Sequence, residues 1–234
     1  MKRHFEKEIE ELEQHLLEMG ALVQRAMERS IQALLERDSE LAERVIGEDD
    51  VIDRLELEID AKTMELIATV QPTAVDLRAI AAIMKITPEL ERIADLAQDV
   101  CERAVELNRE PQLKPFIDLP VLASNAQEMV KLSIDSFVKL DADLARDVIR
   151  RDDDVDRLTE VVFRELLTYM LEDPRNISRA IRLTFIGKYF ERMADGATNI
   201  AEMVVYLVEG RSIKHMAESE LLKRGSHSPN QEPG

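Results

Sequence analysis

The stretch Glu91-Arg92-Ile93-Ala94-Asp95 recurs near the end of the chain as Glu191-Arg192-Met193-Ala194-Asp195. In a helix, residues four apart lie on the same face, so each copy brings two carboxylates together. Two like charges in this arrangement repel each other. The recurrence indicates an internal duplication. It also makes the two acidic helices a candidate site for a bound ligand.

The repetition extends well beyond this motif. With an offset of 103 residues, Asp38 matches Asp141, Leu41-Ala42 matches Leu144-Ala145 and Asp53-Arg54-Leu55 matches Asp156-Arg157-Leu158. At the acidic motif the offset is 100, so three residues are lost between the second and third helices of the repeat. The chain is therefore expected to contain two copies of one structural unit.

Apolar residues in the first half follow a helical period. They run Phe5, Ile9, Leu12, Leu16, Met19, Val23 and Ala26, at spacings of four and three. This pattern predicts a long helix with a bundle seam. Asp38-Ser39 is a helix-start signal for a second helix, which we expect to continue through Gly47 to about Thr69.

A break at Gln71-Pro72-Thr73 precedes a third predicted helix, from about Ala74 to Asn108. Pro88 lies inside it and is expected to bend it. The second half repeats the pattern, with helices predicted at 122–140, 141–171 and 177–209.

These elements predict an all-α protein of two tandem pseudo-symmetric three-helix bundles, with six long helices. The first repeat is expected at 1–110 and the second at 121–211. A linker at 111–120 contains Pro111, Pro115 and Pro120, and a disordered tail is predicted at 212–234.

Composition limits the classes of function. The net charge is −17, from 31 Lys and Arg against 48 Asp and Glu, which disfavours nucleic acid and anionic lipid as partners. The N-terminus lacks the apolar run of a secretory signal, and no stretch approaches the length of a membrane span. We therefore expect a soluble, cytoplasmic protein. The lone Cys101 is expected to be a small core residue.

Acidic residues concentrate on two helices of each half. Carboxylates on neighbouring helices can converge, and a hard cation that prefers oxygen ligands would relieve their repulsion. The alternative is an acidic surface that only contacts solvent. The candidate metal ligands are Asp49, Asp53, Glu91, Asp95 and Asp99 in the first half, and Asp152, Asp156, Glu191 and Asp195 in the second.

An all-oxygen site suggests a divalent or trivalent ion such as iron, manganese, magnesium or calcium rather than zinc. The four histidines lie outside the acidic stretches, so the Glu-x-x-His signature of di-iron bundles is absent. No nucleophile and base are placed together, which disfavours an enzyme. Two alternatives are a metal-storage or metal-dependent carboxylate-bundle protein, and a purely structural helical scaffold.

Three stretches resemble the PhoU family, the accessory and regulatory proteins of bacterial phosphate-specific transport. They are Gln71-Pro72-Thr73-Ala74-Val75-Asp76-Leu77-Arg78, Leu90-Glu91-Arg92-Ile93-Ala94-Asp95, and Phe190 to Glu202. The resemblance covers about residues 5 to 210. It implies two three-helix bundles in a cytoplasmic homodimer that regulates phosphate uptake and holds the phosphate-starvation response off.

The resemblance also implies partners and ligands. The partners are the ATPase subunit of the phosphate ABC transporter and a phosphate-sensing histidine kinase, with membrane association only through them. The family's repeated acid-x-x-x-Asp motifs, which can carry metal clusters, fall on Asp49 with Asp53, Glu91 with Asp95, Asp152 with Asp156, and Glu191 with Asp195. This chain departs from the family at Asp99, where Asn is usual, and at Ala94 and Ala194, where Gly is frequent.

Overall fold

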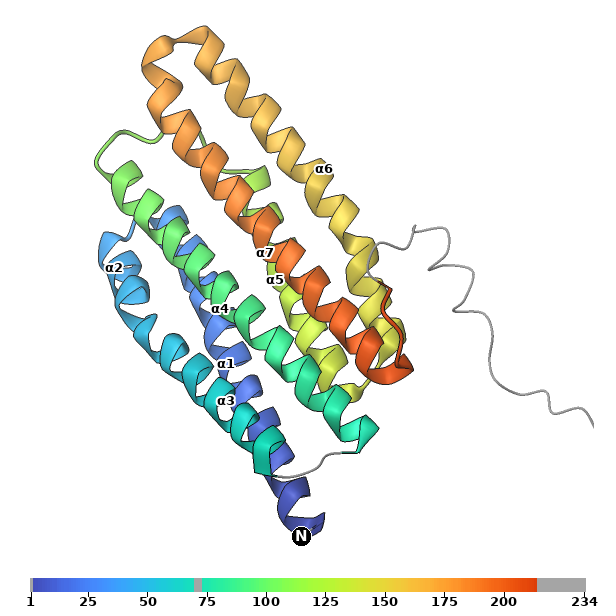
Figure 1. The fold of residues 1–234 in the computed structure, drawn as a ribbon. Coiled ribbons are helices and arrows are strands. Elements are labelled where there is room, and N and C mark those ends of the chain that lie inside the picture. Colours follow the sequence, from blue (N-terminus) through green and yellow to red (C-terminus); the bar gives the residue numbers. More distant parts are fainter. Residues whose placement is uncertain (1, 70–72, 214–234) are drawn as a thin grey trace, which may run out of the picture.

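A computed structural model describes residues 2–69 and 73–213, and these residues form helices and short connections without a strand (Figure 1). The all-α prediction is confirmed. The helices are α1 (Lys2–Glu36), α2 (Ser39–Glu48), α3 (Asp50–Thr69), α4 (Ala74–Asn108), α5 (Asp118–Lys139), α6 (Ala142–Glu172), the short 3-10 helix η1 (Pro174–Asn176) and α7 (Ile177–Glu209).

Helix α1 buries the seam that its spacing predicts. Leu12, Leu16, Met19, Val23 and Met27 are each no more than 3% exposed and line the face toward the core. Since each buried Leu or Met side chain contributes roughly 1.5–3 kcal/mol, this stripe supplies much of the attachment of α1. The side chain of Phe5 lies outside the described part of the structure.

The second predicted helix is interrupted, which corrects the expectation of one continuous element. The interruption falls at Asp49, between α2 and α3, and not at Gly47. Asp49 keeps a helical backbone, and its carbonyl accepts from both Ile52 N (2.8 Å) and Asp53 N (3.2 Å). In the second repeat α6 runs unbroken through the matching Asp152. The irregularity therefore belongs to the first repeat alone.

Helix α4 begins and ends where predicted. The carboxylate of Asp76 accepts from both the N–H (3.1 Å) and the hydroxyl (2.6 Å) of Thr73, which holds the start of the helix. The helix continues through Pro88, and the hydroxyl of the buried Thr87 donates to the Ile83 carbonyl (2.9 Å). Gln71 and Pro72, the predicted break, lie outside the described residues.

The connection between the repeats is shorter than predicted. Helix α5 begins at Asp118 rather than after Pro120, because proline is tolerated in a first turn, whose N–H groups have no helical partner. The connection is held in place by ion pairs. Lys114 is only 7% exposed and pairs with Glu165 of α6, while Arg182 of α7 contacts Glu106 (2.8 Å) at the end of α4.

The turn between the first two helices is duplicated in detail. Arg37 and Leu140 occupy matching positions, and both take the left-handed conformation, with φ of 56° and 50°. The next residue in each copy, Asp38 or Asp141, caps the following helix through its carboxylate. Ile213, within the predicted tail, is buried against the core, and residues 214–234 lie outside the described part.

Helices α4 and α7 lie side by side at the centre of the molecule (Figure 1). The α2–α3 segment flanks α4, α6 flanks α7, and α1 and α5 lie behind them. One hydrophobic cluster includes buried residues of both repeats, so the two bundles share a core. No helix in the described ranges is both long and apolar enough to cross a membrane.

Candidate functional site

The two acidic motifs lie in the same environment. Across residues 91–100 and 191–200 the pattern of buried, half-buried and exposed positions is identical, position by position. In each copy the apolar residues between the acids, such as Ile93 and Ala94, face the core, whereas Asp95 and Asp195 are exposed. The helical spacing thus directs the carboxylates to the outer edge of the α4–α7 pair.

The first acidic surface comprises the predicted acids of the first repeat together with one further residue. Burial, reinforced by the charges of Asp53 and Asp95, raises the pKa of Asp49 to about 6. Burial likewise raises the pKa of Glu91 to about 7, together with repulsion from Asp95 and Glu56. The acids of the segment around α3 therefore interact electrostatically with those of helix α4. We define this surface as Asp49, Asp53, Glu56, Glu91, Asp95 and Asp99.

The second acidic surface comprises Asp152, Asp156, Glu191 and Asp195, on α6 and α7. Burial, reinforced by the charges of Asp195 and Asp156, raises the pKa of Asp152 to about 6. The pKa of Asp156 is raised by burial and then by Glu191. All four predicted acids therefore act on one another across the α6–α7 contact.

Sequence reasoning missed Glu56. Burial raises its pKa, and so do the nearby Asp60, Asp53 and Asp95. Helical periodicity could have found it, because position 56 lies three residues after Asp53 and seven after Asp49. Its match in the second repeat is the buried Thr159, so a search for acids common to both halves excludes it.

The second surface is the less acidic of the two. Asn199 replaces Asp99, Thr159 replaces Glu56, and Lys188 stands where the first repeat has Pro88. Burial and the charges of Glu191 and Asp156 raise the pKa of Asp195, and Lys188, which pairs with Glu191, partly offsets this rise. The duplication has therefore produced two related surfaces with different charge.

The arginine of each motif faces the acids of the other repeat. Burial raises the pKa of both Asp195 and Asp99, and this rise is partly offset by Arg92 at Asp195 and by Arg103 and Arg192 at Asp99. Asn199 also donates to Glu89 across the α4–α7 contact (3.2 Å). These contacts form the boundary between the two acidic surfaces.

The donor chemistry of both surfaces suits a hard cation, since every predicted ligand is a carboxylate. In the conformation of the described residues, however, no three carboxylate, imidazole or thiolate groups converge closely enough to hold a metal ion. A bound ion would require some of these exposed side chains to rotate.

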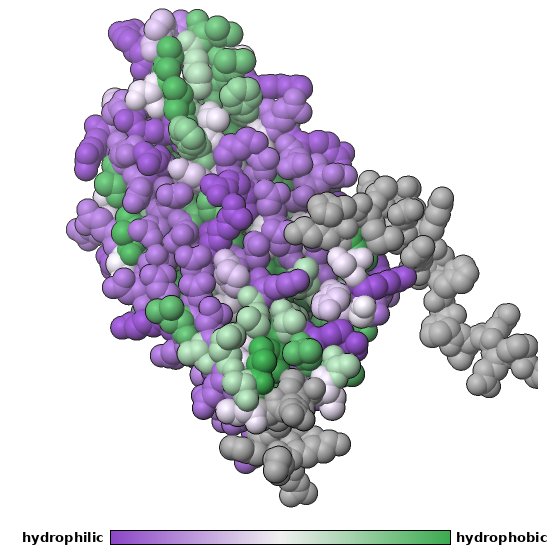
Figure 2. Space-filling model, in the orientation of Figure 1, coloured by the Kyte–Doolittle hydropathy of each residue, from purple (hydrophilic) through white to green (hydrophobic). Residues whose placement is uncertain are grey.

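Hydrophilic side chains cover the middle of the face formed by α3, α4, α7 and α6 (Figure 2). Apolar side chains gather at its two ends, at the α6–α7 and the α3–α4 hairpins. They include Phe163, Leu167, Leu171, Ile181 and Phe185 on α6 and α7, and Met64, Ile67, Val75 and Leu77 on α3 and α4.

Comparison with known proteins gives consistent matches along the chain. The family model described as the PhoU domain matches residues 16–104 and again residues 119–204. The phosphate-specific transport system accessory protein PhoU homolog of Aquifex aeolicus is 46% identical over 209 residues, covering 89% of this chain and 95% of that protein. The corresponding PhoU of Escherichia coli strain K12 is 35% identical, covering 94% and 91%.

Two solved structures have the same fold. PhoU from Pseudomonas aeruginosa superposes with a TM-score of 0.86 at 41% identity, covering 88% of this chain and all of that one. The phosphate transport system regulatory protein PhoU from Streptococcus pneumoniae gives a TM-score of 0.84 at 28% identity, covering 90% and 99%. With both repeats matched in sequence and the whole arrangement matched in structure, the chain belongs to the PhoU family.

Proposed function

We propose that this protein is a non-enzymatic regulator of phosphate uptake that also keeps the phosphate-starvation response off when phosphate is plentiful. The observation that carries the proposal is the match of both repeats to the PhoU domain. Relatives covering most of the chain are named phosphate-specific transport system accessory proteins. Non-enzymatic action is consistent with Cys101, whose burial raises its thiol pKa to about 12 and leaves it unreactive.

The regulator acts by contact with two partners in the cytoplasm, the ATPase subunit of the phosphate ABC transporter and the phosphate-sensing histidine kinase. It does so as a homodimer, and it reaches the membrane only through those partners. The exposed apolar side chains at the two hairpin ends support contact with other proteins, because patches of this kind mark interaction surfaces. The net charge of −17 disfavours direct binding to anionic lipid.

The two acidic surfaces bind divalent or trivalent metal ions, with iron, manganese and magnesium as the candidates. The support is that burial, together with the charges of neighbouring acids, raises the pKa values of Asp49, Glu91 and Asp152. Protonation relieves the repulsion between these carboxylates when no cation is bound, and a bound cation would relieve the same repulsion. Bound ions would then present positive charge to a partner from an otherwise acidic face.

The regulatory role is tested by deleting the gene and following a phosphate-starvation reporter in phosphate-rich medium. We expect the reporter to rise in the deletion strain and to be repressed again by the wild-type chain. A reporter that stays repressed after deletion contradicts the proposal. Co-purification of the tagged chain with the transporter ATPase and the kinase tests the partners separately.

A further inference from the structure

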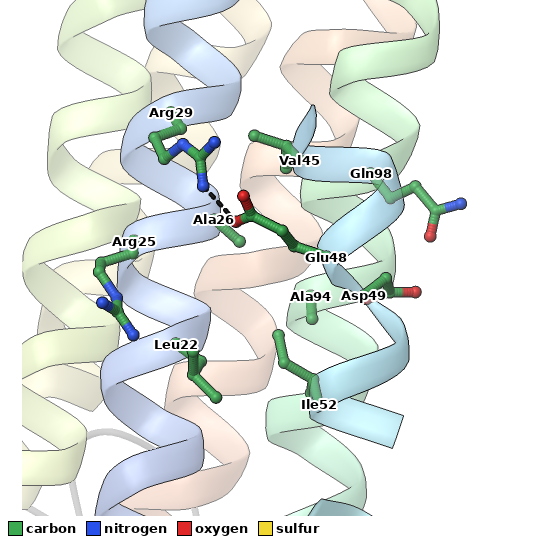
Figure 3. A pocket seen from close by; sticks show the side chains of 10 residues that line it. All are labelled: Leu22, Arg25, Ala26, Arg29, Val45, Glu48, Asp49, Ile52, Ala94 and Gln98. Atoms are coloured by element: carbon green, nitrogen blue, oxygen red, sulfur yellow. Dashed lines mark hydrogen bonds and ion pairs between the residues drawn. The ribbon is translucent and has the colours of Figure 1, made fainter. Parts of the chain in front are cut away.

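The cavity between α1, the α2–α3 boundary and α4 has a volume of about 130 Å³ (Figure 3). Its charged lining is mixed, because Arg29 pairs with Glu48, and Asp49 belongs to the first acidic surface. Pockets for drug-sized ligands measure roughly 300–1,000 Å³. A cavity of this size and mixed charge has no preference for one kind of ligand, and the exposed surface of the molecule offers a larger site.

Exposed apolar side chains run along the α6–α7 hairpin, at one end of the face shown in Figure 2. On each helix they follow one another at intervals of four residues, which places them on one face. Other positions serve the core, since Val162 and Leu166 of α6 and Leu183 and Ile186 of α7 are buried. The exposed residues are therefore additional to those that hold the two helices together. We define this apolar stripe as Phe163, Leu167 and Leu171 of α6 and Ile177, Ile181 and Phe185 of α7.

The stripe has the dimensions of a site for one helix. Phe163 and Leu171 are eight residues apart, about 12 Å along α6, and Ile177 and Phe185 are equally far apart along α7. Because α6 and α7 are packed, antiparallel neighbours, the two rows run side by side (Figure 1). Phe185 also stacks with Tyr189, with 6.3 Å between the ring centroids. Two such rows of exposed apolar side chains can receive the apolar face of an amphipathic helix.

Acidic residues continue the stripe toward the middle of the molecule, where hydrophilic side chains cover the face (Figure 2). Asp156 precedes Phe163 by seven residues, and Asp195 follows Ile181 by fourteen. These intervals are about two and four helical turns, so both acids lie on the same face of their helices as the stripe. Both belong to the second acidic surface. A helix that lies on the stripe and extends past Phe163 therefore meets carboxylates about 10 Å further along.

The matching row of the first repeat is interrupted by charge. Asp60 and Lys85 stand in the places of Phe163 and Phe185, and both are exposed. The ammonium group of Lys85 lies over the ring of Tyr206, 5.9 Å from its centroid. The repeat fold therefore does not require the two phenylalanines, which are particular to the second hairpin.

We propose that the apolar stripe binds an amphipathic helix of another protein, which carries basic residues at the end that reaches the second acidic surface. Charge complementarity selects this occupant, since the stripe continues into carboxylates and the chain carries a net charge of −17. A second copy of this chain brings the same negative charge, and an anionic membrane is repelled as well.

This inference rests on the proposed action by protein contact and names the chemistry of one partner. The proposed homodimer then uses a different surface. The regulatory role is tested in cells with the reporter, whereas the stripe is tested with a peptide and purified protein. Either one can fail without the other.

The test is fluorescence anisotropy of the full chain with labelled synthetic helical peptides of about 16 residues, long enough to reach both the stripe and the acids. One peptide has leucines at intervals of three and four and lysines at one end. Two control peptides replace its lysines by glutamates or its leucines by glutamines. We expect saturable binding of the first peptide and at least about tenfold weaker binding of each control. A chelator in the buffer ensures that the acidic surface carries only the charge of its own side chains.

The double variant Phe163→Asp with Phe185→Lys gives the second hairpin the residues of the first and leaves the net charge unchanged. It should weaken binding of the leucine–lysine peptide at least about tenfold. Met64→Ser with Leu77→Ser, in the first hairpin, is the control and should leave the affinity unchanged. All four positions are exposed, so both variants should fold, which thermal unfolding checks.

The proposal is overturned if the wild type does not bind the leucine–lysine peptide at up to about 1 mM. It is also overturned if the glutamate peptide binds equally well, or if the first-hairpin variant weakens binding as much as the second. Sedimentation velocity tests a second copy as the occupant, and self-association that the phenylalanine variant abolishes would contradict the proposal. Cosedimentation with phosphatidylglycerol vesicles that depends on the same two phenylalanines would contradict it in favour of a membrane.

Discussion

Ile93 of α4 lies against Gly196 of α7 so closely that a Cβ at position 196 would be 3.0 Å from both Cγ1 and Cδ1 of Ile93. These two residues belong to the two copies of the acidic motif, so the motifs pack against each other at the centre of the molecule. Ile93 is 1% exposed and has little room to move. The matching residue of Gly196 in α4 is Leu96, and so the contact is asymmetric.

Gly196→Ala should destabilise the protein by about 1–2 kcal/mol. Overpacking a core costs typically about 1–3 kcal/mol, and the better helix propensity of alanine returns up to about 1 kcal/mol. Gly47→Ala is the matched control: Gly47 lies in α2, and a Cβ added there would meet no neighbouring atom within 4 Å, so the same change should stabilise by about 0.5–1 kcal/mol. Urea unfolding measures both, and equal effects would contradict the close contact.

The duplicated left-handed turn predicts opposite results for one substitution. Leu140 has φ of 50° and is 57% exposed, so Leu140→Gly should relieve backbone strain and stabilise by about 0.5–1 kcal/mol. Arg37→Gly should destabilise, because the Arg37 guanidinium donates to the carbonyls of Leu107 (3.2 Å), Asn108 (3.0 Å) and Glu110 (2.6 Å). Thermal denaturation compares them. Stabilisation by both would mean that the Arg37 contacts contribute nothing.

A buried ion pair fastens the end of α7 to α6. Arg146 is 7% exposed and pairs with two acids. The side chain of Glu209 is 22% exposed, whereas that of Asp143 is 84% exposed. Glu209→Ala leaves this guanidinium without its inner partner and should cost about 3 kcal/mol. Asp143→Ala removes an 84% exposed partner and should cost under about 1 kcal/mol. Chemical denaturation measures the free energy of unfolding of both variants. Similar decreases in that free energy would argue against a buried ion pair between Arg146 and Glu209.

The raised carboxyl pKa values should make the protein more stable at lower pH. Burial raises the pKa of Glu91 to about 7 and those of Asp49 and Asp152 to about 6, above their unfolded values. The folded state therefore holds protons more tightly, and this contribution is fully present below the unfolded values near 4. It is lost as pH rises through about 7.

With a chelator present, the free energy of unfolding should thus be higher at about pH 5 than at about pH 8. Replacing Asp49 and Asp152 together by Asn should reduce the difference. Unfolding in urea at the two pH values provides the measurement. A wild-type protein that is less stable at the lower pH, with the double variant unchanged, would show that these acids do not interact as described.

Much of the fold follows from local sequence signals. The seam of α1, the bounds of α4 and the two acidic motifs are set by helical periodicity and capping residues that short stretches contain. The predicted start of α5 is wrong because Pro120 acts as a breaker only inside a helix and not in a first turn. The interruption at Asp49 has no signal in the residues around it, since the nearby Gly47 lies within α2.

The acidic surfaces were predictable because duplication repeats the same acids at the same spacing. Glu56 could not be found in this way, because its match in the second repeat is Thr159. Only its spacing along the helix places it on the same face as Asp49 and Asp53. The placement of Arg92 beside Asp195 depends on how α4 packs against α7, which no local pattern encodes. Contacts between the two repeats therefore could not be predicted from the sequence and are known only from the structure.

The central claim, that the duplicated acidic surfaces bind metal ions, is tested most directly by elemental analysis of protein purified without chelators. The comparison is between wild type and the double variant Asp95→Asn with Asp195→Asn. The account predicts bound metal in the wild type and its loss from the double variant. Wild type without metal, and without a gain in stability when iron, manganese or magnesium is added, would contradict it.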